Sequence, residues 1–136
     1  MRPLEGMRVI DLTHVLAGPF ATHQLCMMGA EVIKIEKPGE GDQTRGLALR
    51  PEMKGLAPGF VALNSGKRSV VVDLKTDDGR GVIERLVATA DVFVENFPDR
   101  YIADVTKRPK LKRKLKVVAA CGNGTAGAFA PKVLEA

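Results

Sequence analysis

Apolar and polar positions along this chain alternate between short strand-like runs and longer stretches with helical spacing. That alternation is typical of βαβ units, in which helices connect the strands of a mostly parallel sheet. The runs that we predict as strands are residues 7–12, 31–36, 69–74, 91–97 and 116–121. With 136 residues, the chain can form one core but is too short for two ordinary domains. We therefore predict a single α/β domain over residues 1–136, with a mostly parallel sheet of about five strands.

Helices are expected between these strands. The first opens at Gly18-Pro19 and ends near Gly29, because Pro suits a first helical turn and Gly a C-terminus. The second follows Asp77-Asp78, and its apolar residues share one face, which we expect to pack in the core. That face consists of Val82, Ile83, Leu86, Val87 and Ala90. A third helix is predicted over residues 128–136, whereas residues 37–58 form a long excursion rich in Gly, Pro and charge, which is typical of a functional or disordered segment.

The net charge of +5 is unevenly distributed along the chain. Residues 1–97 carry 12 Lys and Arg against 13 Asp and Glu, whereas residues 98–136 carry 9 against 3. Within the segment 98–114, the basic residues are concentrated in the run 107–114, which contains no interleaved aromatic residue and no groove-reading motif. We interpret this segment as a solvated basic linker, so a nucleic-acid partner is not expected.

No apolar run approaches the roughly 20 residues that a transmembrane helix needs. The N-terminus also lacks the basic and then apolar pattern of a secretory signal. We therefore expect a cytoplasmic protein with no membrane partner.

Polar residues with potential chemistry lie at the predicted strand ends. His14 follows the first strand, Lys75 follows the third, and Asn96 and Phe97 end the fourth. Open α/β sheets bind ligands at the carboxyl ends of their strands, so these positions are candidates for a binding site. The two histidines and two cysteines form neither a metal-ligand spacing nor a Ser/His/Asp or Cys/His arrangement, so no metal site and no catalytic residue is predicted.

Gly122, Gly124 and Gly127 match the G-x-G-x-x-G dinucleotide fingerprint between a predicted strand and a predicted helix. The acidic residue expected about 20 positions later, which would bind a ribose hydroxyl, does not follow in the sequence. We interpret these glycines as a tight strand-to-helix turn. The segment is not a P-loop, because Ala128-Phe129 stands where a Lys and a Ser or Thr are needed.

Four stretches of the first 97 residues resemble family III CoA-transferases, the group that includes formyl-CoA and carnitine CoA-transferases and the α-methylacyl-CoA racemases. They are PLEGMRVIDLTHVLAGPFAT at 3–22, GAEVIKIEKPGEGDQTR at 29–45, NSGKRSVVVDLKTDDGR at 64–80 and ADVFVENF at 90–97. The resemblance implies a Rossmann-like three-layer domain that holds coenzyme A or acyl-CoA, with a CoA thioester as partner. The residues that it implies for the pocket are His14, Val15 and Ala17 near the reactive end, Lys37 at a phosphate, and Val72 to Lys75, Asn96 and Phe97 at the nucleotide.

The sequence departs from that family after Phe97. Family III enzymes carry the acyl group on an aspartate well beyond the ENF segment, and nothing resembling that region follows here. The resemblance therefore implies a truncated domain without covalent acyl transfer. From about Tyr101 the chain resembles phosphomannomutase and phosphoglucomutase enzymes, most clearly in LKVVAACGNGTAGAFAPKVLEA at 115–136. The expected organisation is thus a chimera, natural or engineered, of a CoA-transferase-like part (1–97), the linker (98–114) and a mutase-like strand, turn and helix (115–136).

Three functional hypotheses remain open from the sequence. The first is a truncated CoA-transferase-like domain that binds CoA or acyl-CoA without turnover. The second is a ligand-free structural chimera that forms a homodimer through its exposed sheet edge. The third is a subunit completed by a separate CoA-transferase chain that carries the aspartate.

Overall fold

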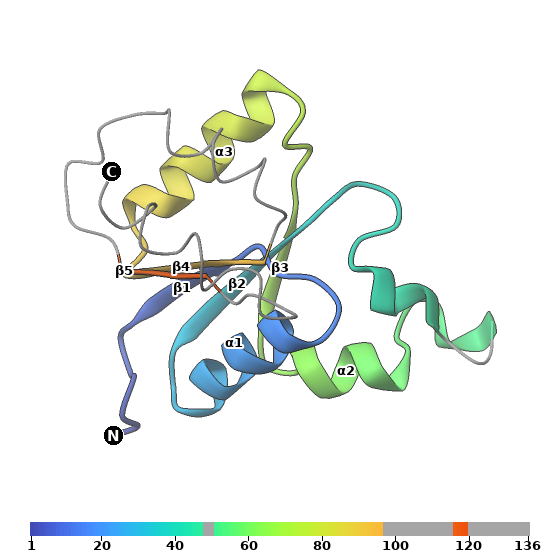
Figure 1. Cartoon of the computed structure of the whole chain (residues 1–136), viewed down its shortest axis with the longest axis horizontal. Helices are drawn as coiled ribbons and strands as arrows, with labels where there is room; N and C mark the ends of the chain where they lie inside the picture. Colours follow the sequence, from blue (N-terminus) through green and yellow to red (C-terminus); the bar gives the residue numbers. More distant parts are fainter. Residues whose placement is uncertain (48–50, 97–115, 120–136) are drawn as a thin grey trace.

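A computed structural model describes residues 1–47, 51–96 and 116–119 of the chain (Figure 1). Its strands are β1 (Arg8–Asp11), β2 (Glu31–Glu36), β3 (Arg68–Val71), β4 (Val92–Glu95) and β5 (Lys116–Ala119). Its α-helices are α1 (Ala17–Met27), α2 (Pro58–Asn64) and α3 (Asp77–Ala88). Two short 3-10 helices, η1 (Gln43–Leu47) and η2 (Pro51–Met53), lie between β2 and α2. None of the helices described is long and apolar enough to cross a membrane.

The strands form one sheet in the order β3-β2-β1-β4-β5, and every neighbouring pair is parallel. The predicted parallel α/β architecture is therefore confirmed. The chain winds outwards from β1 to β2 and β3, and then crosses back to β4 on the other side of β1. This reversal makes the junction of β1 and β4 the topological switch point, where open α/β sheets form a crevice for ligands.

Helices cover both faces of the sheet, so the domain has three layers: α3 lies on one face, and α1 and α2 lie on the other (Figure 1). On the α3 face, Ile10, Leu12, Ile33 and Ile35 form a buried cluster. Residues of the predicted helical stripe, Val82, Ile83, Leu86 and Ala90, belong to this cluster or pack against it, which confirms their assignment to the core. Burial of this apolar surface is the main contribution to the stability of the layer.

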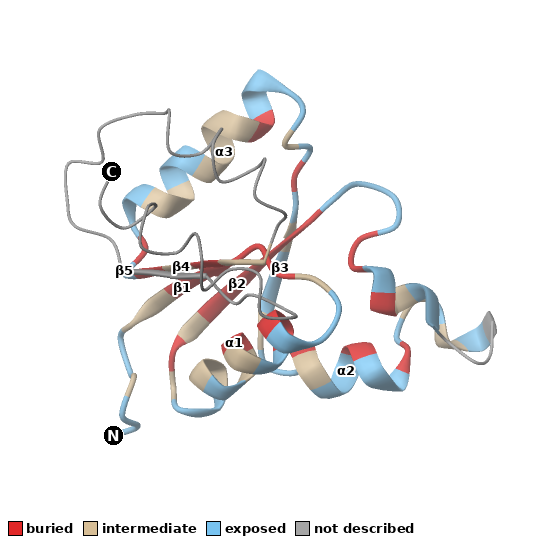
Figure 2. Ribbon diagram, in the orientation of Figure 1, coloured by how far each residue is buried: buried red, intermediate tan, exposed pale blue. Residues whose placement is uncertain are grey.

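The opposite face of the sheet changes character along the strands. At the amino ends, Val9, Val32 and Val92 form an apolar cluster with Leu25 of α1 packed against it. Towards the carboxyl ends the same face carries charged side chains that are also buried. They are Asp11, Lys34 and Glu36, each at most 2% exposed. Figure 2 shows the resulting continuous burial along β1 and β2.

Element boundaries differ from the prediction in several places. The second strand has its predicted limits, but the third runs from Arg68 to Val71 rather than over 69–74. Helix α2 was not predicted, and part of the 37–58 excursion forms η1 and η2. Gly29 directly follows α1 and its C-cap with φ 107°, as its predicted role at the helix end requires. The linker (98–114), the glycine pattern of 122–127 and the helix predicted at 128–136 lie outside the described residues.

Candidate functional site

The loops that follow the parallel strands meet at the carboxyl edge of the sheet. His14 comes from the loop after β1, Lys37 follows β2, Lys75 lies beyond β3, and Asn96 directly follows β4. The fold therefore brings residues from four separate segments to one edge, as the sequence predicted. Phe97, the remaining candidate of the predicted strand 91–97, lies outside the described residues.

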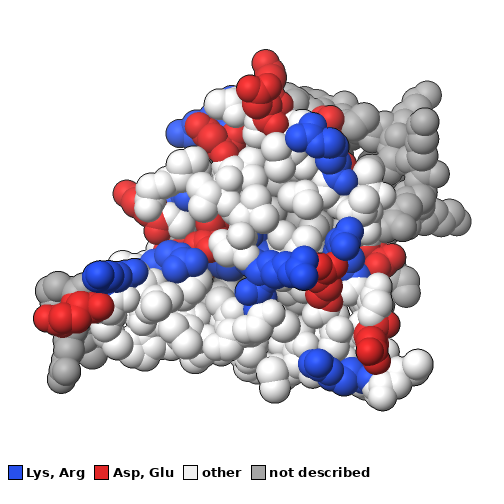
Figure 3. All heavy atoms as spheres, turned by 180° about the vertical axis from the view of Figure 1, so that it is seen from behind, with Lys and Arg blue, Asp and Glu red and all other residues white. Residues whose placement is uncertain are grey.

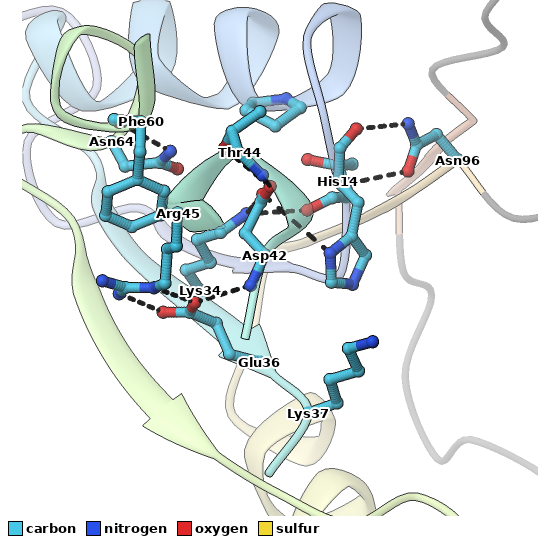
Figure 4. A network of polar contacts seen from close by, with 12 residues as sticks. His14, Lys34, Glu36, Lys37, Asp42, Thr44, Arg45, Phe60, Asn64 and Asn96 are labelled. Atoms are coloured by element: carbon cyan, nitrogen blue, oxygen red, sulfur yellow. Dashed lines mark hydrogen bonds and ion pairs between the residues drawn. The ribbon is translucent and has the colours of Figure 1, made fainter. Parts of the chain in front are cut away.

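His14 and Asn96 are joined directly across the switch point (Figure 4). The backbone N–H of His14 donates to Oδ1 of Asn96 at 2.9 Å, and Nδ2 of Asn96 donates to the C=O of His14 at 2.9 Å. These bonds engage one donor and one acceptor of the amide. The structure thus assigns Asn96 a positioning contact to the β1–α1 loop, in addition to its predicted place beside a nucleotide.

Val15, the next residue in that loop, has a left-handed backbone conformation with φ 73°. A β-branched residue rarely adopts positive φ, and such strain is concentrated at functional sites. Val15 is 44% exposed and Leu16 is 64% exposed, so neither residue is held in place by the core. Ala17, the first residue of α1, is also exposed. The loop consequently presents an apolar surface beside His14, where the family resemblance implies the reactive end of the ligand.

A buried ion pair lies behind His14. Nζ of Lys34 is 2.9 Å from Oδ2 of Asp42, and it donates a hydrogen bond to the C=O of Thr13 at 2.7 Å. Nδ1 of His14 is 3.9 Å from the same Asp42 oxygen. Lys34 therefore links the loop after β1 to the loop after β2. Figure 4 shows this pair between the His14 ring and the Glu36 carboxylate.

The surroundings of His14 favour its neutral form. Burial lowers the pKa of His14 below its ordinary value of 6.5, and the charge of Lys34 lowers it further. Three carboxylates act in the opposite direction without reversing this result: Asp42, Asp11 and Glu36. At neutral pH the ring is thus a neutral imidazole with one donor and one acceptor nitrogen.

Glu36 and Arg45 form a second ion pair beside the first. Nε of Arg45 lies 2.6 Å from Oε2 of Glu36 and Nη2 lies 2.7 Å from Oε1, which is the bidentate geometry of strong guanidinium–carboxylate pairs. The Arg45 guanidinium also lies 3.8 Å from the ring centre of Phe60. Burial raises the pKa of Glu36, but hydrogen bonds from Arg45 and Ser69 outweigh it and lower the pKa to about 2. The pair fixes the loop after β2 against α2.

A third ion pair holds the start of α1. Nζ of Lys67 lies 3.0 Å from Oδ2 of Asp11, which also accepts a hydrogen bond from Oγ1 of Thr22 at 2.6 Å. Both side chains are at most 1% exposed. Lys67 also bonds the C=O of Pro19 and the side chain of Asn64. This ammonium is buried beneath α1 and α2, so its bonding is internal to the protein.

The other predicted site residues differ in their accessibility. Lys37 and Lys75 are exposed, and Lys37 forms an ion pair with Glu40. Val72 is 6% exposed and packs in the core, so its side chain does not line the edge of the sheet. Its backbone N–H donates to the C=O of Glu36, which extends the pairing of β3 with β2 by one residue.

The buried charges of this edge were not among the residues predicted from the sequence; they are Asp11, Lys34, Glu36, Asp42 and Lys67. A signal for three of them was present, because Asp11, Lys34 and Glu36 lie inside predicted strands. A strand of a parallel sheet is covered on both faces, so a charge within it is buried and needs a partner. The partners Asp42 and Lys67 come from connecting segments, whose path was not predictable from periodicity.

Charges of both signs are mixed on the surface of the described residues. Figure 3 shows Lys and Arg side chains in a band across the back of the molecule, with Asp and Glu side chains beside them. A nucleic-acid-binding surface typically carries a basic patch or stripe. The most basic run of the sequence, residues 107–114, lies outside the described residues.

The sequence model of CoA-transferase family III matches residues 4–119. A succinate–glutarate CoA-transferase of Agrobacterium fabrum is 44% identical over 139 aligned positions, covering 94% of this chain and 34% of the relative. A succinyl-CoA:glutarate CoA-transferase of Mus musculus is 48% identical over 97 positions, covering 71% of this chain and 22% of the relative. The crystal structure of a CAIB/BAIF family protein from Brucella suis superposes with TM-score 0.74 at 38% identity, covering 87% of this chain and 33% of that one.

The chain spans about a third or less of the length of these relatives. The similarity also continues past Phe97, where we expected it to end, because the family match reaches residue 119. The resemblance of residues 101–136 to mutases stays a prediction.

Proposed function

Because the chain belongs to CoA-transferase family III, we propose that the carboxyl edge of its sheet binds coenzyme A or an acyl-CoA thioester. The observation that carries this proposal is the pair of hydrogen bonds between His14 and Asn96 at the switch point. The Asn96 side chain bonds both the N–H and the C=O of His14. Ligands of open α/β sheets bind at this position. The contact holds the loop of His14, Val15 and Ala17 in place before a ligand arrives, which lowers the entropic cost of binding.

In the proposed pocket, different residues contact the acyl–pantetheine end and the nucleotide end of the ligand. The exposed apolar side chains of Val15 and Leu16 suit the pantetheine arm and the acyl group. Lys37 and Lys75 provide exposed ammonium groups for the phosphates of the nucleotide end. Val72 contributes through the position of the β3–α3 connection, since its side chain is in the core.

Acyl transfer requires more than this binding site. A transferase of this family mechanism needs a carboxylate nucleophile, and we propose that none of the described residues provides it. The carboxylates nearest His14, Asp42 and Asp11, are fully buried and bonded to lysines, so they are unsuited to attack a thioester. Turnover would then depend on a carboxylate that lies outside the described residues.

The names of the matched relatives suggest which class of acyl group the ligand carries. Of the matched relatives, two are named for succinate and glutarate and others, at 47–48% identity, for formyl-CoA and oxalate; we propose a short dicarboxylic acyl group for this chain. Succinyl-CoA is the probe to compare with free CoA. Tighter binding of succinyl-CoA is expected, whereas equal binding would contradict recognition of the acyl group by these residues.

Thermal unfolding with and without millimolar CoA tests the proposal, with NAD and ADP as controls. A ligand that binds only the folded state must raise the midpoint by mass action. We expect a rise with CoA that exceeds the rise with either control. A cooperative transition that CoA does not move would favour the ligand-free structural chimera.

Charge-matched variants locate the binding. Lys37→Ala and Lys75→Ala each remove one exposed positive charge from the proposed edge. Arg85→Ala removes one exposed positive charge from the last turn of α3, whose C-terminal end leads into β4 at the opposite edge of the sheet. The two lysine variants should reduce the CoA-dependent shift, and the Arg85 variant should retain it. An equal reduction in all three would indicate nonspecific attraction of the CoA phosphates.

Assembly distinguishes the remaining hypotheses. Copurification with a CoA-transferase chain that carries the missing carboxylate would support a subunit of a larger enzyme. Homodimerisation through an exposed sheet edge stays a prediction, and light scattering that detects only monomer would contradict it.

A further inference from the structure

Lys34 and Asp42 form a charged pair that is withdrawn from water directly behind the candidate site. The Lys34 side chain is 1% exposed and that of Asp42 is fully buried. Burying two charges costs more than their attraction commonly returns, so such a pair is weak evidence of a stabilising role. Its placement is informative, because its bonds reach Thr13 and its carboxylate faces His14.

The orientation of the Asp42 carboxylate is fixed by its own loop. Its Oδ1 accepts hydrogen bonds from the backbone N–H and the hydroxyl of Thr44, at 2.9 and 2.7 Å. Oδ2 is therefore directed at Lys34 on one side and at Nδ1 of His14 on the other. The His14 backbone is in turn fixed by Asn96. Both members of the His14–Asp42 contact are thus held by independent bonds.

The contact selects one form of the imidazole. A carboxylate oxygen is an acceptor, so the neutral ring is stabilised with its proton on Nδ1, the nitrogen that faces Asp42. At 3.9 Å the two atoms are beyond hydrogen-bond distance, and such contacts commonly shorten when a ligand binds. The positive charge of Lys34 opposes a second proton on the ring. The remaining nitrogen, Nε2, is then the acceptor.

We propose that Lys34 and Asp42 are positioning residues that hold His14 as a neutral imidazole protonated on Nδ1, so that Nε2 accepts a hydrogen bond from a pantetheine amide N–H of bound coenzyme A or acyl-CoA. The first half of this proposal concerns the free protein alone, and the second half rests on the proposed function. Asp11 and Glu36 also face His14 electrostatically, but each is neutralised by its own partner, Lys67 and Arg45. Removing the charge of Lys34 and removing the charge of Asp42 should shift the pKa of His14 in opposite directions.

Nitrogen-detected NMR titration of the histidines tests the first half. The chain contains only His14 and His23, so His23 is an internal reference in every spectrum. In the parent protein, His14 should titrate below its ordinary pKa of 6.5 and show the Nδ1–H tautomer when neutral. Asp42→Asn should lower the His14 pKa further, whereas Lys34→Met should raise it.

Opposite changes of the His14 pKa in the two single variants are the distinguishing result. Loss of structure would instead move the His14 pKa towards its ordinary value in both variants. An unchanged or raised pKa in a folded Asp42→Asn protein, or a neutral ring protonated on Nε2 in the parent, would overturn the proposal. If a single variant does not fold, Lys34→Met/Asp42→Asn leaves no uncompensated buried charge. That double variant must lose the preference for the Nδ1–H tautomer.

CoA binding tests the second half separately. The double variant should bind CoA up to about tenfold more weakly than the parent, as expected for one misplaced hydrogen bond. Arg8→Met/Glu31→Gln is the control, because it removes an ion pair (2.7 Å) at the amino ends of β1 and β2 and should leave CoA affinity unchanged. Equal affinity of parent and Lys34→Met/Asp42→Asn would overturn the role in binding. Absence of CoA binding to the parent would instead refute the proposed function, while the NMR result for the free protein would stand.

Discussion

The side chain of Asn96 bonds the backbone of His14 twice, accepting from its N–H and donating to its C=O, each at 2.9 Å. The two residues are 82 positions apart. Their hydrogen bonds join the end of β4 to the loop after β1, at the point where the order of strand addition in the sheet reverses. Asn96→Ala would leave a partly buried donor and acceptor without these bonds. We expect it to lower the free energy of unfolding by about 1–3 kcal/mol.

Urea denaturation measures this loss, and Asn96→Asp is the matched variant. The aspartate keeps the acceptor for the His14 N–H but has no donor for the C=O, so its stability should lie between those of the parent and Asn96→Ala. Wild-type stability of Asn96→Ala would show that the two contacts contribute little in solution.

Stability should depend on pH through Glu36. Its folded-state pKa is lowered from 4.5 to about 2 by the hydrogen bonds of Arg45 and Ser69, which outweigh the effect of burial. A carboxyl group with a lowered folded pKa stabilises the protein above its unfolded pKa, and this contribution is lost as the pH falls from 4.5 towards 2. The contribution is at most about 3 kcal/mol.

Glu36→Gln isolates this effect from that of other carboxyl groups. The difference in unfolding free energy between parent and variant should shrink as the pH is lowered from 6 towards about 2. A difference that stays constant over this range would contradict the assigned ion pair with Arg45.

Gly18 allows α1 to approach the end of β1. A Cβ at this position would lie 2.3 Å from Cβ of Thr13, and the Thr13 side chain is fully buried. Gly18→Ala should therefore destabilise the protein by about 1–3 kcal/mol. Gly59→Ala, in α2, is the control, because a Cβ there meets no atom within 4 Å. It should be neutral or stabilising by up to about 1 kcal/mol, and thermal unfolding of both variants checks the contrast.

Val15 provides a test of whether strain in the β1–α1 loop serves binding. Asn tolerates the left-handed conformation that Val15 adopts at φ 73°. Val15→Asn should therefore leave the unfolding midpoint unchanged or raise it, while CoA binding weakens through loss of the apolar side chain. Reduced stability together with unchanged CoA affinity would refute both expectations.

The sequence predicted the architecture well because burial on both faces gives parallel strands a clear apolar signal. Residues 31–36 are a strand with the predicted limits, and Val82, Ile83 and Leu86 of α3 pack against the core as expected. Helix α2 was missed because its seven residues are too few to establish a helical period. Likewise, the location of His14 and Asn96 at one edge followed from strand order, whereas their direct bonding depended on side-chain geometry.

Buried charges were the part of the site that periodicity could not supply. The alternation in residues 31–36 places Lys34 and Glu36 on one face, and only the packing of α1 and α2 shows that this face is dry. Their partners Asp42 and Arg45 lie in the long excursion after β2, whose path depends on these same ion pairs. The backbone path of this segment and its ion pairs depend on each other. The sequence therefore indicated a functional segment but not the contacts that it makes.

Mapping of CoA-induced shifts in the backbone amide NMR spectrum tests the central claim most directly. If CoA binds where we propose, shift changes should concentrate at the carboxyl edge, in residues 13–17, 73–75 and Asn96. The amides of residues 6–8 and 29–31, at the opposite edge, should not move. Saturable changes confined to the carboxyl edge would establish the binding site. Changes at the opposite edge, or none at millimolar CoA, would contradict it.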